Sequence, residues 1–161
     1  MATIRLVAID DAMQRALEES PAALEQLVGG SLGPVAELAG DLIVQTAAYL
    51  KNQPREPQWG CFLTIDAATG QVVGTCGYKG GPADDGTVEA AYFTFPPFEG
   101  RGFATAMATE LRRRAGERRV IAHTLPERNA SCRVLEKAGF AYVGEAVDPE
   151  DGLVWRWVGE G

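Results

Sequence analysis

The segment that decides the fold is PPFEGRGFATAMATELRRR, residues 96–114, in which two prolines and two glycines precede a helix-forming sequence. The prolines end a β-rich stretch, because proline cannot donate to a sheet ladder. Gly100 and Gly102 stand before a helix predicted from about Gly102 to Arg114. The N-terminus of a helix has unpaired N–H groups and a partial positive charge, so glycines there let a phosphate approach the backbone. The alternative is a tight strand-to-helix turn that binds nothing.

The spacing of these glycines excludes two common nucleotide motifs. The chain has no G-x-x-x-x-G-K-[ST] sequence for a nucleoside triphosphate, and no G-x-G-x-x-G after its first strand for a dinucleotide. We therefore expect another anion at this loop.

The sequence on both sides of this segment alternates between strand and helix patterns. Period-two and β-branched stretches predict strands at 3–9, 59–66, 71–79, 87–95, 118–125, 140–147 and 153–158. Helical spacing and capping signals predict helices at 10–19, after Ser20-Pro21, after Pro34, at 102–114 and at 129–139. No repeat or linker divides the chain, so residues 1–161 are predicted to form one α/β (α+β) domain.

Composition limits the partners. The 161 residues include 15 basic and 22 acidic side chains, a net charge of −7, which predicts no binding to nucleic acid or to an anionic membrane and favours a cationic ligand. The sequence shows no membrane span and no signal peptide, so we expect a cytoplasmic protein. Cys61, Cys76 and Cys132 have no paired spacing, so neither a disulfide framework nor a metal site is expected.

Two longer motifs carry a family resemblance. EGRGFATAM (99–107) follows a strand ending in FTFPP, and AHTLPERNASCRVLEKAGFAYVGE (122–145) comes after it. From about Trp59 onward the chain resembles the GNAT acetyltransferase superfamily, and within it the branch of the ribosomal-protein N-acetyltransferases. The resemblance implies a mixed, mostly antiparallel sheet of about seven strands flanked by helices, with a splayed cofactor cleft. It also implies acetyl-CoA as co-substrate and direct attack by a primary amine, of a protein N-terminus or a small molecule, in a ternary complex.

The resemblance also implies which residues contact acetyl-CoA. The backbone from Arg101 to Thr105 would face its diphosphate, and the pantetheine arm would run beside the strand that carries Phe93. Glu99 stands where the family has Arg or Gln, and we expect it to point to solvent. The predicted cofactor residues are Phe93, Thr94, Phe95, Gly100, Arg101, Gly102, Phe103, Ala104, Thr105 and Asn129.

Acetyl transfer to an amine needs a base, because an alkyl amine has a pKa near ~10 and is mostly protonated at neutral pH. Glu89, in a strand with little packing reason for a carboxylate, is the first candidate, and His123, the single histidine, is the second. Leu135 replaces the tyrosine that many relatives use as proton donor, so Ser131 is predicted as the substitute. The plainer alternatives are an exposed glutamate, a structural histidine, and helix N-capping by Ser131 or Asn129.

Three further expectations concern partners and function class. A catalytically silent acyl-CoA-binding or regulatory module is the main alternative, because Leu135 and Glu99 depart from the family pattern. Asp84 and Asp85 are placed near the mouth of the acceptor site, where they could attract a cationic amine. Residues 153–158 are expected to form an edge strand that could pair across a homodimer.

Overall fold

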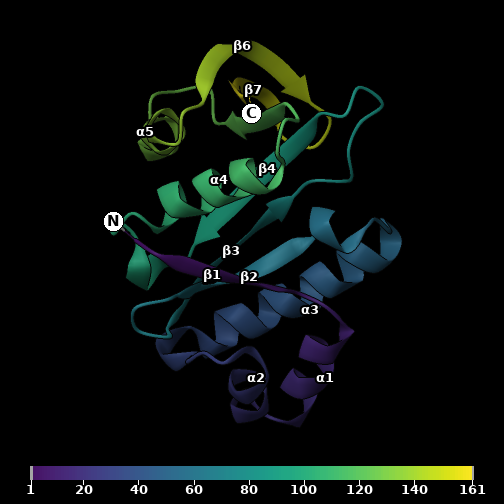
Figure 1. The fold of residues 1–161 in the computed structure, drawn as a ribbon, viewed down its shortest axis with the longest axis vertical. Helices are drawn as coiled ribbons and strands as arrows, with labels where there is room; N and C mark the ends of the chain where they lie inside the picture. Colours follow the sequence, from purple (N-terminus) through teal and green to yellow (C-terminus); the bar gives the residue numbers. More distant parts are fainter. Residues whose placement is uncertain (1, 161) are drawn as a thin grey trace.

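The computed structural model describes residues 2–160, and a seven-stranded sheet forms its centre (Figure 1). The spatial order is β1-β2-β3-β4-β5-β7-β6, with antiparallel neighbours except for the parallel pair β4–β5. This confirms the predicted mixed, mostly antiparallel sheet flanked by helices. The strands are β1 (Ile4–Ala8), β2 (Cys61–Asp66), β3 (Val72–Tyr78), β4 (Val88–Thr94), β5 (Val120–Thr124), β6 (Ala141–Asp148) and β7 (Gly152–Gly159).

The helices begin and end at the capping signals in the sequence. The side chain of Ser20 accepts from the N–H of Ala23 at the start of α2, and left-handed Gly29 ends that helix. A 3-10 turn at Gly33–Val35 delays α3 to Ala36, slightly later than predicted. None of the helices within residues 2–160 is long and apolar enough to cross a membrane. The helices are α1 (Asp11–Glu19), α2 (Pro21–Val28), α3 (Ala36–Asn52), α4 (Phe103–Arg114) and α5 (Ala130–Lys137).

Two hydrophobic clusters cover opposite faces of the sheet. Strand β2 alternates between them: Leu63 and Ile65 pack with α1, α2 and α3, whereas Phe62 packs with α4 and α5. Figure 1 shows α1, α2 and α3 gathered on one side and α4 with α5 on the other. Strand β4, as part of this sheet, therefore lies between two layers of helices.

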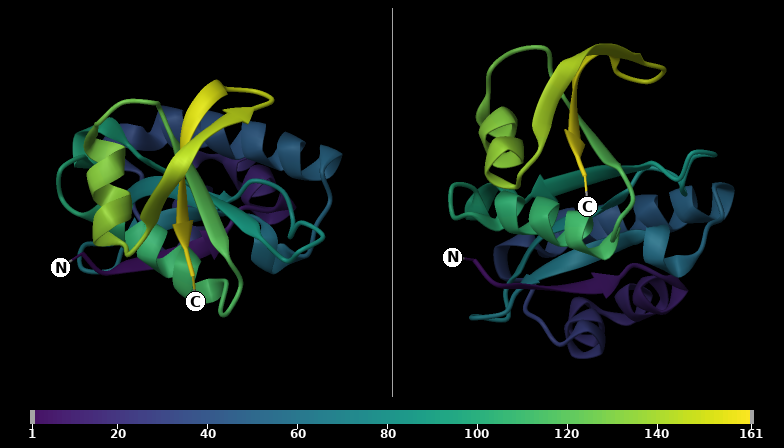
Figure 2. Two further views of the ribbon diagram at one scale, coloured as in Figure 1. Left: turned by 90° about the horizontal axis from the view of Figure 1, so that it is seen from above. Right: turned by 45° about the horizontal axis from the view of Figure 1, so that its top comes forward.

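Strands β4 and β5 separate soon after they meet. Their register contains only the pairs Val88–Val120 and Glu89–Ile121, so the rest of β4 runs alongside no β5 partner. The half-sheet β5-β7-β6 turns away from β1–β4 (Figure 2). This is the splay that the sequence analysis expected beside the cofactor.

The expectation of an edge strand at residues 153–158 is wrong. These residues belong to β7, which pairs with both β5 and β6, so β6 is the edge of the sheet. The indole N–H of Trp157 donates to Thr124 Oγ1 on β5 (3.1 Å), which holds β7 in the interior.

Candidate active site

The loop between β4 and α4 presents backbone donors at a helix start. Gly100 and Gly102 have φ angles of 75° and 87°, a left-handed conformation that glycine adopts without steric cost. Helix α4 begins at Phe103, with Gly102 as its N-cap. The N–H groups of its first turn have no intrahelical acceptor, so they point toward whatever lies in front of the helix. This geometry suits a phosphate or another anion.

A cleft of about 510 Å³ opens in front of this loop. It lies between the end of β4, the loop and α5, and Arg133 and Lys137 of α5 add positive charge to its wall. Thr94 Oγ1, in the same wall, is buried and makes no hydrogen bond within the described residues. An unpaired buried hydroxyl is costly unless a ligand satisfies it, so the cleft suits an anionic ligand with polar groups along its length.

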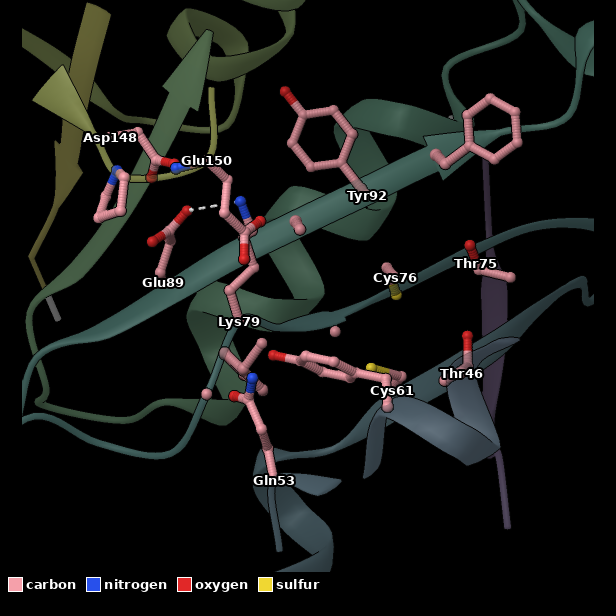
Figure 3. Close-up of a pocket in the computed structure, with 17 residues that line it drawn as sticks. Thr46, Gln53, Cys61, Thr75, Cys76, Lys79, Glu89, Tyr92, Asp148 and Glu150 are labelled. Atoms are coloured by element: carbon pink, nitrogen blue, oxygen red, sulfur yellow. Dashed lines mark hydrogen bonds and ion pairs between the residues drawn. The ribbon is translucent and has the colours of Figure 1, made fainter. Parts of the chain in front are cut away.

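A second cavity, of about 470 Å³, lies between α3, β3, β4 and the β6–β7 turn (Figure 3). Tyr92 and Phe93 line both this cavity and the cleft. The two spaces therefore meet at β4, where it has separated from β5. These two residues form the boundary that the two spaces share.

The second cavity is acidic on one side. Glu89, Asp148 and Glu150 line it, and Figure 3 shows their side chains grouped near Lys79. Lys79 Nζ lies 3.7 Å from Glu89 Oε2 and 3.7 Å from Asp151 Oδ2. Partial burial lowers the pKa of Lys79, but the nearby carboxylates, Glu89 foremost, outweigh burial and raise it overall. The cavity therefore favours a cation.

Glu89 and His123, the two predicted bases, lie in contact. His123 Nδ1 is 3.3 Å from Glu89 Oε2 and 3.8 Å from Asp148 Oδ2, and its side chain is 9% exposed. These three residues bring one potential metal ligand each within 4.8 Å of the others. Arg156 Nε donates to His123 Nε2 (3.1 Å), so that nitrogen is engaged and Nδ1 is the ring atom that faces the carboxylates. The cluster thus places one ring nitrogen against two carboxylates and the other against a cation.

The cysteines of the second cavity are poor nucleophiles. Burial raises the pKa of the Cys76 thiol to about 12, and burial also raises the pKa of Cys61. The reactive form of cysteine is the thiolate, and because their pKa values are raised, both side chains are mainly neutral thiols at neutral pH. The arrangement is therefore suited to direct transfer between two ligands rather than to a covalent step on cysteine.

Tyr92 is a functional candidate that the sequence analysis missed. Burial raises the pKa of its phenol to about 12, and a hydrogen bond with Ser131 lowers the pKa only in part, so the hydroxyl stays protonated at neutral pH. It lies where the two spaces meet, whereas Leu135 is fully buried in the core. The available signal was its position, three residues after Glu89 in a strand expected to flank the cleft.

The structure brings most of the predicted cofactor residues to the cleft, but not all. Phe95 is fully buried against α1, α2 and α3, Arg101 lies over the ring of Phe98 (5.6 Å), and the side chain of Asn129 caps α5 by accepting from Cys132 N–H. None of these three lines the cleft. The predicted residues that line it are Phe93, Thr94, Gly100, Gly102, Phe103, Ala104, Thr105 and Ser131.

Other placements differ from the sequence-based expectations. Asp84 and Asp85 do not line the second cavity, and Asp85 accepts from the N–H of Thr87 in its own loop. The acidic side chains of the cavity are those of Glu89 and of the β6–β7 turn instead. Glu99 is exposed, but it also lines the cleft, where its carboxylate adds negative charge.

Comparison with known proteins agrees with this geometry. The model of the acetyltransferase (GNAT) domain matches residues 3–141. No curated protein matches the sequence. A ribosomal-protein alpha-N-acetyltransferase in complex with coenzyme A has a similar structure (15% identity, TM-score 0.64, 99% of this chain and 95% of that chain).

Two further similar structures are of enzymes whose names give different amine substrates. An aminoglycoside acetyltransferase in complex with coenzyme A shares 16% identity (TM-score 0.64, 99% of this chain and 95% of that chain). A chimera of spermidine N-acetyltransferase from Vibrio cholerae shares 14% identity (TM-score 0.64, 98% of this chain and 94% of that chain). At these identities the likeness concerns the fold.

Proposed function

This chain belongs to the GNAT acetyltransferase family, and from that premise we propose that it transfers an acetyl group from acetyl-CoA to a cationic primary amine. The observation that carries the proposal is the meeting of the two spaces at Tyr92 and Phe93, with a helix N-terminus on one side and Glu89 on the other. The acceptor is a protein N-terminus or a small-molecule amine. We also propose that all 161 residues act as one domain, because β6 and β7 complete the same sheet beyond the family match.

The cleft residues fit acetyl-CoA, which supplies the thioester. The N–H groups of the first turn of α4, together with Arg133 and Lys137, would bind its phosphates. The unpaired hydroxyl of Thr94 would bind a polar group of the pantetheine arm. Glu99, the departure from the family pattern, lines the cleft but is exposed to solvent, which screens its charge from a bound phosphate.

The main chain of β4 supplies donors for the charge that develops on the acetyl oxygen. Val88 N–H donates to Arg119 on the β5 side of β4, and successive residues of a strand point their main-chain groups to alternate sides. The N–H groups of Tyr92 and Thr94 therefore face the gap between β4 and β5, where no β5 partner is registered. Donors placed there would stabilise an oxyanion.

The proton transfers are divided between two residues of β4. Glu89 accepts the proton of the acceptor amine, directly or through a water molecule, on the acidic side of the cavity. Tyr92 donates a proton to the departing thiolate, and Ser131, whose side chain lowers the pKa of the phenol slightly, is its polar neighbour in the cleft. We thus assign the donor role to Tyr92 and keep Ser131 as its partner. The amine attacks the thioester directly in a ternary complex.

The test is the release of free thiol from acetyl-CoA with a panel of amines that contains polyamines, aminoglycosides and peptides with free N-termini. We expect cationic primary amines to accelerate release, with one class far ahead of the others. Acetyl-CoA binding without acceleration by any amine would instead support a silent acyl-CoA-binding module.

A further inference from the structure

His123 is held between a cation and two carboxylates. On β7, Arg156 is the direct cross-strand partner of His123, and its Nε lies 3.1 Å from His123 Nε2. On the other side, Nδ1 lies 3.3 Å from Glu89 Oε2 of β4 and 3.8 Å from Asp148 Oδ2 of β6. Lys79 of β3 is the next charge outward, because it contacts Glu89 rather than the ring.

The contact with Arg156 fixes where the imidazole proton resides. A guanidinium group has N–H donors and no acceptor, so His123 Nε2 must accept with its lone pair. An imidazolium would place an N–H against the N–H of Arg156 and a second positive charge beside it. The remaining state is a neutral ring with its proton on Nδ1, a buried atom that makes no well-formed hydrogen bond within the described residues and faces Glu89.

We propose that Arg156 keeps His123 neutral with its proton on Nδ1, and that His123 is a positioning residue that holds the carboxylate of Glu89 in place as the base. Nε2 is occupied by Arg156 and Nδ1 carries a proton, so His123 has no free lone pair with which to accept the proton of the amine. Oε2 of Glu89 lies 3.3 Å from Nδ1, close enough for the ring dipole to hold that oxygen without a well-aligned hydrogen bond, and the other carboxylate oxygen would take the acceptor amine or a water molecule. This inference rests on the proposed function, and it selects between the two bases that the sequence left open.

The experiment uses the fact that His123 is the single histidine of the chain. Long-range ¹H–¹⁵N NMR spectra of the ¹⁵N-labelled 161-residue chain at pH 7 report the protonation of both ring nitrogens. We expect protonated Nδ1 and unprotonated Nε2. A ring protonated on Nε2, alone or together with Nδ1, would overturn the proposal. This measurement needs no turnover, so it is decided independently of whether any amine is acetylated.

Two substitutions test the cause. Arg156→Lys keeps a cationic donor without an acceptor and should preserve the neutral ring. Arg156→Met removes the donor, and the carboxylates of Glu89 and Asp148 then favour a doubly protonated ring. An imidazolium paired with Glu89 weakens the base, so turnover should fall about tenfold in Arg156→Met, with unchanged acetyl-CoA affinity and recovery in Arg156→Lys. Arg128→Met, which removes an exposed pair with Glu136, is the control. Identical ring protonation in Arg156→Met and the wild type would refute the role of Arg156.

Discussion

Lys79 Nζ lies 3.7 Å from Oε2 of Glu89, inside the cavity where the proposed acceptor amine must reach the same carboxylate. The side chain of Lys79 is 37% exposed and also contacts Asp151 of the β6–β7 turn. The ammonium of Lys79 therefore lies beside Glu89, where the charged amine of the proposed acceptor would bind. An acceptor that binds near Glu89 competes with an internal counterion.

Replacing Lys79 with methionine should favour cationic acceptors. The carboxylates of Glu89 and Asp151 lose their internal partner, so a charged amine binds with less competition. Because exposed ion pairs contribute about 0–1 kcal/mol, we expect KM for the acceptor to fall about two- to fivefold. Lys51→Met, which removes an exposed pair with Asp11 outside the cavity, serves as control. Steady-state kinetics at low salt measure the effect, and a higher KM in Lys79→Met would contradict it.

Replacing Glu89 with glutamine should lower turnover without weakening acetyl-CoA binding. Glutamine keeps the shape of the side chain but cannot accept the proton of the amine. General-base catalysis typically contributes about 10²–10⁴-fold, so kcat at neutral pH should fall within that range. Glu145→Gln, an exposed glutamate of β6 that lines neither space, should leave kcat unchanged. A normal kcat in Glu89→Gln would mean that Glu89 is not the base and that it only contacts Lys79 and His123.

Tyr92→Phe tests the proton donor. The substitution keeps the ring and its packing but removes the hydroxyl, so thiolate departure loses its acid and kcat should fall about 10- to 100-fold at neutral pH. Because burial raises the pKa of Tyr92 to about 12, its deprotonation should produce no loss of activity below about pH 10. Ser131→Ala should have a smaller effect, since it removes only a polar neighbour of the phenol and leaves the hydroxyl in place. Tyr142→Phe, on an exposed tyrosine of β6, is the control, and equal rates in both Phe variants would remove Tyr92 from the mechanism.

Gly102→Glu should abolish acetyl-CoA binding. The new side chain would combine an unfavourable left-handed backbone with a carboxylate at the proposed diphosphate site, and we expect Kd to rise more than about tenfold. Gly116→Glu is a matched control, because Gly116 also has a positive φ (66°) and open space around its Cα, but lies beyond the far end of α4. Calorimetric titration with coenzyme A separates the two variants. If both variants lose affinity equally, the loss comes from a lower stability of the protein and not from a change at the loop.

The parts of the fold that the sequence predicted depend on local signals. Proline and glycine around residue 100, the Ser20 cap and the alternation of β2 each act within a few residues. The cluster around His123 depends instead on the sheet order, because Arg156 meets His123 only when β7, not β6, lies next to β5. Both strands of that hairpin alternate in a similar way, so the sequence does not show which one is inside. The burial of Phe95 was hidden from the sequence for a related reason, since it depends on helices far away in the sequence.

Leu135 provides the last test, because it occupies the position where many relatives carry the donor tyrosine. Its side chain is fully buried in the cluster with α4, so a tyrosine there would overfill the core and bury a hydroxyl. We expect Leu135→Tyr to lower the free energy of unfolding by about 1–3 kcal/mol in urea denaturation, whereas Leu135→Met should cost less than about 1.5 kcal/mol. We also expect the double variant Tyr92→Phe/Leu135→Tyr to stay as slow as Tyr92→Phe. Recovery of turnover in the double variant would mean that α5 can present a donor to the cleft, and the proton would then not have to come from β4.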